Sequence, residues 1–89
     1  MELNISIAIW QREDWFIAKC PELDFVSQGR TSNEARENLL ELIQIQFAEM
    51  AEMGTLDEYL AECGYVRNGN PLGLQMEMVG FEKRSIQVA

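Results

Sequence analysis

Positions 2–9 of the chain alternate between polar or small residues and apolar ones. The apolar positions are Leu3, Ile5, Ile7 and Ile9. An alternation with a period of two predicts a β-strand with one buried face. After a polar break over residues 11–14, the run Trp15–Ala18 is apolar on both faces and rich in aromatic and β-branched character. That composition predicts a second, more central strand.

Proline and glycine mark the limits of the next elements. Pro21 cannot donate a hydrogen bond to a neighbouring strand, so we expect the second strand to end near Cys20 and residues 21–24 to form a connection. Residues 25–28 then form a third strand, which Gly29 terminates. This part of the chain therefore predicts three strands joined by short connections.

A long helix is predicted directly after the third strand. Thr31 and Glu34 have the spacing of a capping box, in which each side chain accepts a hydrogen bond from the backbone N–H of the other residue. At roughly 100° per residue, an apolar stripe covers an arc of about 160°. Its members are Leu42, Ala35, Leu39, Met50, Ile43, Phe47 and Leu40. Either the stripe covers a broad sheet, or its edge around Leu40 and Phe47 packs on a second subunit.

A short helix and a loop are expected after the long helix. Gly54 breaks the long helix, and Thr55 with Glu58 has the spacing of a second capping box. Gly64 stands where a glycine commonly follows the end of a helix. Residues 68–73 are rich in turn-forming types and predict a loop.

Two strand signals remain near the end of the chain. Residues 74–79 alternate modestly, and Ile86 with Val88 predicts a last strand that starts near Lys83. The order β-β-β-α-(α)-β predicts an α+β two-layer sandwich with an antiparallel three-stranded meander. A right-handed helical crossover would place the final strand parallel to the first.

The chain length allows one domain. At 89 residues, we expect a single domain over residues 1–89, with help from oligomerisation or a partner. Its core is expected in residues 3–53 and 83–89. The short helix and loop over residues 55–73 are expected to be an insertion.

The net charge of the chain indicates which classes of partner it can bind. Fifteen acidic residues against seven basic ones give a formal net charge of −8, which opposes binding to phosphate backbones and favours a basic protein partner. We therefore expect no direct DNA binding from this chain alone. In the predicted helix, Arg36 is the only cation, and the outer face carries Glu37, Glu41, Glu49 and Glu52. A solvated acidic face and a surface for a basic partner both fit this pattern.

The residue inventory argues against catalysis and against a membrane location. The chain contains no histidine, which removes the usual general base and the commonest metal ligand. Cys20 and Cys63 match no zinc or redox spacing and are expected to be free thiols. No apolar run approaches about 18 residues, and the start lacks the features of a signal peptide, so we expect a cytoplasmic protein without cofactors.

The segment from Cys20 into the helix carries the most specific pattern of the chain, C-P-E-L-D-F-V-S-Q-G-x-T-x-x-E-A-x-x-N-L. This run resembles the central signature of the HicB antitoxin family, and the resemblance covers roughly residues 3–50. It implies the truncated RNase H-like fold of the HicB amino-terminal domain. Many family members have Pro-Gly where this chain has Asp24-Phe25. Many also append a DNA-binding region, for which the last part of this chain shows no pattern.

The resemblance also implies a function and a partner. HicB proteins neutralise small basic HicA-type toxins that cleave messenger RNA, so this chain is expected to bind and occlude such a toxin without being an enzyme. Four acidic residues are the candidates for toxin contact. They are Glu22 and Asp24 in the connection between strands, and Glu37 and Glu41 on the helix.

Two other functions stay open at this point. The first is an orphan accessory protein that forms a homodimer or higher homo-oligomer without a toxin. Its candidate interface residues are Leu40, Phe47, Met76 and Met78. The second, more remote, is a metal-dependent nuclease. Its candidate carboxylates are Asp14, Glu22, Asp24 and Glu34, although a magnesium site needs two or more of them to converge.

Overall fold

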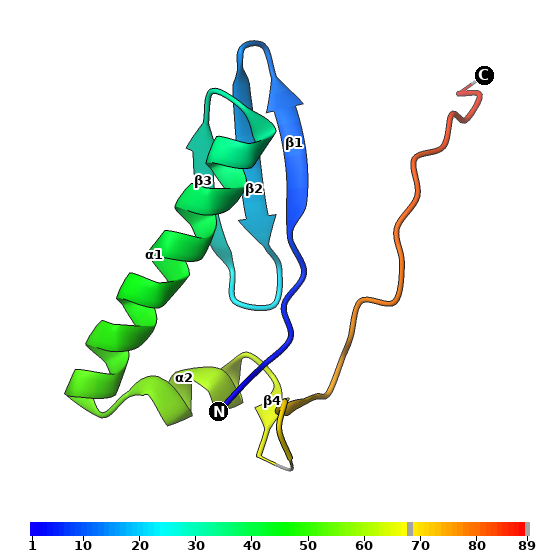
Figure 1. Cartoon of the computed structure of the whole chain (residues 1–89). Coiled ribbons are helices and arrows are strands. Elements are labelled where there is room, and N and C mark those ends of the chain that lie inside the picture. The colour runs from blue at the N-terminus through cyan, green and yellow to red at the C-terminus, as the bar shows by residue number, and fades with distance from the viewer. Residues whose placement is uncertain (68, 89) are drawn as a thin grey trace.

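A computed structural model describes residues 1–67 and 69–88 of the chain and shows an α+β arrangement (Figure 1). Three antiparallel strands form one sheet in the order β1-β2-β3, and two helices and a small two-stranded sheet follow. The elements are β1 (Ala8–Arg12), β2 (Trp15–Cys20), β3 (Phe25–Gly29), α1 (Ser32–Met53), α2 (Leu56–Glu62), β4 (Tyr65–Val66) and β5 (Gly73–Leu74). The predicted three-stranded meander and the helices after it are confirmed.

Short connections hold the meander in register. The β1–β2 turn consists of two residues, and Glu13 adopts the left-handed conformation there with φ of 57°. The β2–β3 connection starts at Pro21, as predicted, and Asp24 ends it with φ of 58°. Between these two residues Leu23 is fully buried, so the connection is part of the core as well as a link.

The limits of α1 follow from local chemistry. The Thr31 hydroxyl accepts a hydrogen bond from the Glu34 N–H at 2.9 Å, which confirms the predicted cap. Gly54 ends the helix in the left-handed conformation, with φ of 74°. The second predicted capping box is wrong, because Thr55 has a helical backbone and makes no side-chain cap. Its hydroxyl faces the Met50 carbonyl instead, at 3.5 Å.

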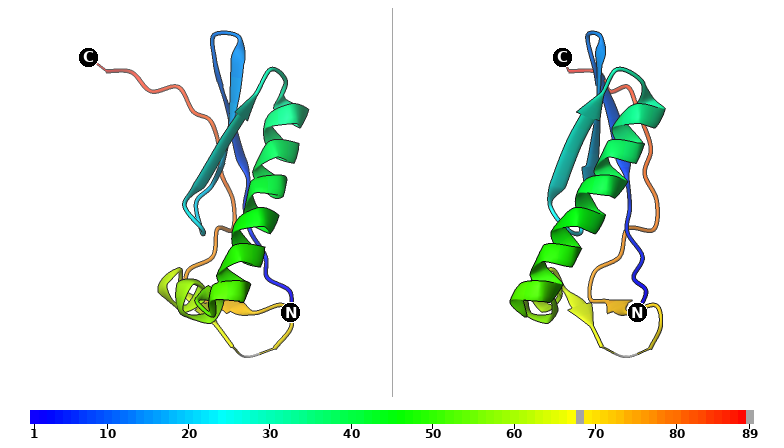
Figure 2. Two further views of the ribbon diagram at one scale, coloured as in Figure 1. Left: turned by 90° about the vertical axis from the view of Figure 1, so that its left-hand side faces the viewer. Right: turned by 60° about the vertical axis from the view of Figure 1, so that its left-hand side comes forward.

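The helix α1 covers one face of the sheet and leaves the other face uncovered by any helix (Figure 2). It packs chiefly on β3 and β2, and only its edge meets β1. A side chain at Gly29 would lie 2.7 Å from the Ala35 nitrogen, so the close approach of sheet and helix requires glycine there. The buried core consists of Ala18, Cys20, Leu23, Ala35, Leu39, Ile43, Leu60 and Tyr65.

The core extends beyond the ranges expected from sequence. Leu60 of α2 and Tyr65 of β4 are only 3% and 4% exposed, although residues 55–73 were expected to be an insertion. The Tyr65 hydroxyl donates to the Asn4 carbonyl at 2.7 Å. The Tyr59 hydroxyl donates to the Leu23 carbonyl. These two bonds tie the α2–β4 region to both the start of the chain and the β2–β3 connection.

The first strand begins later than the alternation predicts. The apolar residues at positions 3, 5, 7 and 9 do pack against the core, but β1 starts only at Ala8. The N–H of Ser6 donates to the Glu22 carboxylate at 2.8 Å rather than to a neighbouring strand. Because a side chain satisfies this backbone group, the segment before β1 is held in place without belonging to the ladder.

The predicted final strand is absent from the described residues. Residues 75–88 form no strand and extend away from the other elements (Figure 1), and Ala89 lies outside the described part. A parallel contact with the chain start is made instead by Leu72, the residue before β5, which forms a parallel bridge with Leu3. The Leu72 N–H donates to the Glu2 carbonyl at 2.8 Å. Of the strand signal over residues 74–79, only Leu74 belongs to a strand.

Candidate interaction surfaces

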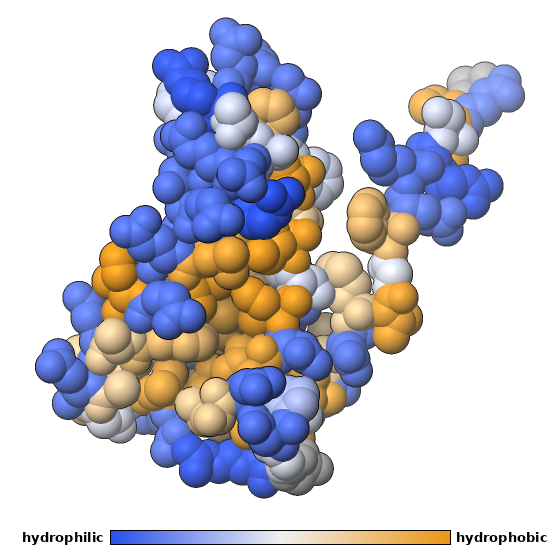
Figure 3. Space-filling model, in the orientation of Figure 1, coloured by the Kyte–Doolittle hydropathy of each residue, from blue (hydrophilic) through white to orange (hydrophobic). Residues whose placement is uncertain are grey.

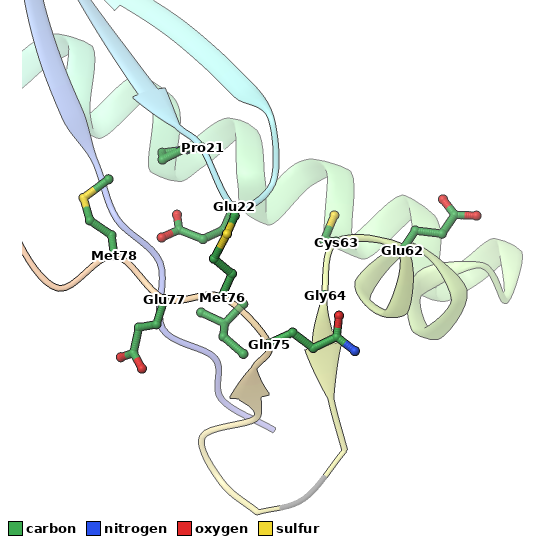
Figure 4. Close-up of a pocket in the computed structure, with 10 residues that line it drawn as sticks. Pro21, Glu22, Glu62, Cys63, Gly64, Gln75, Met76, Glu77 and Met78 are labelled. Carbon is green, nitrogen blue, oxygen red and sulfur yellow. The ribbon is translucent and has the colours of Figure 1, made fainter.

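A hollow lies between the β2–β3 connection, the end of α2 and the start of the C-terminal tail (Figure 4). Its lining includes Glu22, Glu62 and Glu77, which come from three separate segments. In Figure 4 the carboxylates of Glu62 and Glu77 point away from the space between these segments. Across residues 1–67 and 69–88, no group of three or more cysteine, aspartate or glutamate side chains is arranged to hold a metal ion.

Glu22, a predicted contact for a toxin, has a structural role. Its carboxylate accepts the Ser6 N–H at 2.8 Å and lies 3.7 Å from the Cys20 thiol, which donates to it. Burial opposes ionisation of Glu22, but the hydrogen bonds from Ser6 outweigh burial and lower the pKa of the carboxyl below its ordinary value. Burial, with the nearby Glu22 charge, raises the pKa of Cys20 to about 11. Glu22 therefore fastens the chain start to the end of the sheet.

Asp24 is exposed at the same end of the sheet. Beside it the ring of Phe25 stacks on Tyr59 of α2, with centroids 6.0 Å apart and planes inclined by 12°. Burial raises the pKa of Tyr59 to about 12, so its hydroxyl stays protonated and donates to the Leu23 carbonyl near neutral pH. These contacts of Tyr59 in α2 thus hold the connection that carries Asp24 in place.

The outer side of α1 forms an acidic ridge, defined here as Glu37, Glu41, Glu49 and Glu52. All four are exposed. No ion pair within the described residues neutralises any of them, since the two salt bridges found there join Arg67 to Asp57 and Arg84 to Glu82. Ile45 lies among these glutamates and is 50% exposed. The ridge thus combines unpaired negative charge with one accessible apolar side chain.

The four predicted toxin contacts do not form one cluster. Glu37 and Glu41 lie in the first half of α1, on the side opposite its buried residues. Glu22 and Asp24 lie in the β2–β3 connection, at the end of the sheet nearer α2 (Figure 1). A single partner that touched all four would have to bridge the helix and the connection.

The predicted oligomer contacts also fall into two places. Leu40 is 37% exposed, whereas Phe47 is partly buried against the core. Apolar residues gather over the second half of α1 and beside it, while the hairpin end of the sheet is hydrophilic on the same face (Figure 3). Met76 and Met78 belong to the tail and line the hollow near Pro21 (Figure 4). They are 86% and 46% exposed.

The sequence interpretation did not identify the residues that make up the face of the sheet opposite α1. We call it the tryptophan face and define it by Trp10, Arg12, Trp15, Lys19 and Arg30. Trp10 and Trp15 are 59% and 38% exposed. The run Trp15–Ala18 reads as apolar throughout, but in the structure its alternate residues face opposite ways. Ala18 is buried under α1, and the residues on either side of it point to the open face.

Comparison with models of protein families, with curated proteins and with solved structures gives no match for this chain. Neither helix in the described ranges is both long and apolar enough to cross a membrane. A functional proposal therefore depends on the sequence pattern around Cys20–Gly29 and on the chemistry of the surfaces described above.

Proposed function

We propose that this chain is a HicB-like antitoxin of the cytoplasm, which binds and occludes a small basic HicA-type toxin. The observation that carries the proposal is the acidic ridge of α1, whose four exposed glutamates have no cationic partner in the described residues. The resemblance of the segment from Cys20 to Leu39 to the HicB signature supports the same function. The order of the three-stranded meander and the long helix agrees with what that resemblance implies for this part of the chain.

The ridge has the dimensions of a protein contact. From Glu37 to Glu52 it spans fifteen residues, or about 22 Å at 1.5 Å per residue. Unpaired negative charge of this extent accelerates encounter with a basic surface and selects against acidic partners more than it adds affinity. Ile45 supplies the apolar contact that charge alone lacks, because the centre of a protein interface is usually desolvated.

A homo-oligomer is part of the proposal, and an accessory protein that only self-associates is the second candidate. The specific observation in its favour is the apolar character of the tail. Side chains at Met76, Val79, Phe81, Ile86 and Val88 are between 83% and 95% exposed, which is unusual for a free surface. Pairing of the tail with another copy would bury these side chains, and Leu40 could join such an interface.

We do not propose an enzyme or a protein that binds DNA without a partner. The candidate carboxylates of a nuclease come from different parts of the chain. Asp14 lies in the β1–β2 turn and Asp24 in the β2–β3 connection, at opposite ends of the sheet. Glu22 is already engaged with Ser6. A pair of magnesium-bound carboxylates needs closer convergence than this.

The test is to look for a small basic reading frame beside the gene and to co-express the two proteins, followed by co-purification and an RNA-cleavage assay; the absence of such a frame would count against the proposal. The wild-type chain is expected to co-purify and to suppress cleavage. The double variant Glu37→Lys/Glu41→Lys is expected to lose both. Its control is Glu77→Lys/Glu82→Lys, which changes the net charge equally at exposed tail positions without regular structure. Equal binding by the two double variants, or no binding by the wild type, would refute the proposal.

A further inference from the structure

The tryptophan face is basic although the chain as a whole is acidic. The strand register and its continuation place nine side chains on this face of the sheet. They are Ala8, Trp10, Arg12, Trp15, Ile17, Lys19, Val26, Gln28 and Arg30. Three of the nine are cations and none is an acid. The face therefore carries three of the seven basic residues of the chain and both of its tryptophans.

The cations and the indole rings are arranged in one stripe. The Arg30 guanidinium lies over the Trp15 ring at 4.1 Å from its centroid, and the Lys19 ammonium lies 5.6 Å from the Trp10 centroid. Trp10 pairs with Ile17, so Trp10 and Trp15 are diagonal neighbours on adjacent strands. Such neighbours are about 7–8 Å apart. The order across the sheet is thus cation, ring, ring, cation.

Acidic residues flank both ends of this face, and Asp24 lies at the end opposite the β1–β2 turn. Glu13 and Asp14 in the β1–β2 turn flank one end of it. The acidic ridge is on the outer side of α1, so the thickness of a helix, about 10 Å, and the sheet itself separate the ridge from the tryptophan face. Since the screening length is about 8 Å at physiological ionic strength, the ridge leaves the local positive potential largely intact.

We infer that the tryptophan face binds single-stranded RNA. Its two partly exposed indole rings lie on adjacent strands and offer flat stacking surfaces for bases, and the flanking cations can pair with the phosphates. The Arg30 guanidinium, which lies 4.1 Å from the Trp15 ring centroid, is a further planar group on which a base can stack. The inference is independent of the proposed toxin partner, because it uses the opposite layer of the molecule.

A second copy of the chain fits this face less well. Two tryptophan faces packed against each other would bring the cations of one copy, among them Arg12 and Lys19, against those of the other. Apart from the two indole rings the apolar contribution is small, since Val26 is 51% exposed but Ile17 is already half-buried. Charge complementarity therefore favours a polyanion with planar groups over self-association.

Indole fluorescence tests this inference directly, because both tryptophans of the chain lie on this face. We would titrate the full chain with a ten-nucleotide uridine oligomer at low salt, following indole fluorescence and the anisotropy of labelled RNA. Binding is expected to quench the fluorescence. It is also expected to weaken as salt rises, with a log–log slope of about −2 if three phosphates are neutralised. Trp10→Ala is expected to weaken binding about tenfold through loss of one stacked base.

Two matched double variants distinguish binding at this face from a general effect of the net charge. Lys19→Gln/Arg30→Gln keeps both tryptophans and is expected to reduce the slope to about −0.7. The control Arg67→Gln/Arg84→Gln alters the net charge equally, away from the sheet, and is expected to leave the slope unchanged. Three results would overturn the inference: equal effects of both double variants, the same quenching by a ten-residue glutamate peptide, or quenching on concentration of the protein alone.

Discussion

Tyr65 offers the sharpest test of the packing between β4 and the start of the chain. The side chain is 4% exposed, and its hydroxyl donates to the Asn4 carbonyl at 2.7 Å across 61 residues of sequence. Tyr65→Phe keeps the buried ring and removes only the donor. Because Asn4 is itself exposed and its carbonyl can bind water instead, the expected loss is about 1 kcal/mol of unfolding free energy.

Tyr65→Ala removes the ring as well and tests whether β4 belongs to the core. Loss of a buried aromatic ring costs about 3–5 kcal/mol, which is a large part of the stability of a small domain. Urea unfolding followed by indole fluorescence would measure both variants, with the slope of the transition required to stay constant. If residues 55–73 were a peripheral insertion, Tyr65→Ala would cost less than about 1 kcal/mol. That outcome would refute the packing described for β4.

Three further predictions concern local chemistry. Thr31→Ala should destabilise the chain by about 1 kcal/mol in the same urea assay, because the Glu34 N–H loses its cap, and an unchanged midpoint would contradict this. The Glu22 carboxylate has a lowered folded-state pKa, so its contribution to stability is present above its ordinary value of 4.5 and is lost as pH falls below it. Stability curves of the wild type and Glu22→Gln should therefore differ at pH 7 and converge in acid, and a constant difference would count against the Ser6 contact. Cys20 is buried with a pKa raised to about 11, so a thiol reagent at pH 8 should label Cys63 first, and faster labelling of Cys20 would be inconsistent with the core.

Sequence reasoning succeeded where structure follows from short-range chemistry. The cap at Thr31, the end of α1 at Gly54 and the end of β2 before Pro21 each depend on a few neighbouring residues. The predicted cap at Thr55 is wrong. The spacing of Thr55 and Glu58 fits a capping box, but the helical backbone of Thr55 directs its hydroxyl to the Met50 carbonyl. A capping pattern specifies residue types, whereas the bond also needs an extended backbone at the cap.

The remaining differences involve contacts between distant residues. The late start of β1 depends on the bond between Ser6 and Glu22, which a strand pattern does not reveal. Residues 83–88 have a strand-like alternation but no partner strand in the described structure, and a strand needs a partner as well as a pattern. The tryptophan face is not evident from the sequence because Trp15–Ala18 is apolar throughout. The pattern therefore does not show which side of β2 faces the helix.

The two outer surfaces of the sandwich differ in charge. Figure 2 shows α1 and the sheet as two layers. The acidic ridge belongs to the outer side of α1, and the tryptophan face belongs to the outer side of the sheet. A basic partner on the ridge would leave both tryptophans accessible. Indole fluorescence can therefore distinguish the two events, since only binding at the sheet should quench it strongly.

The central claim is that the ridge captures a basic toxin through charge. The most direct measurement is the association rate constant between this chain and the neighbouring basic protein, determined by stopped-flow at several salt concentrations. If charge drives capture, the association rate constant should fall steeply as salt rises. At low salt, the rate constant of Glu37→Lys/Glu41→Lys should be at least tenfold lower than that of the wild type. Equal rates for the wild type and this variant at every salt concentration would contradict the account.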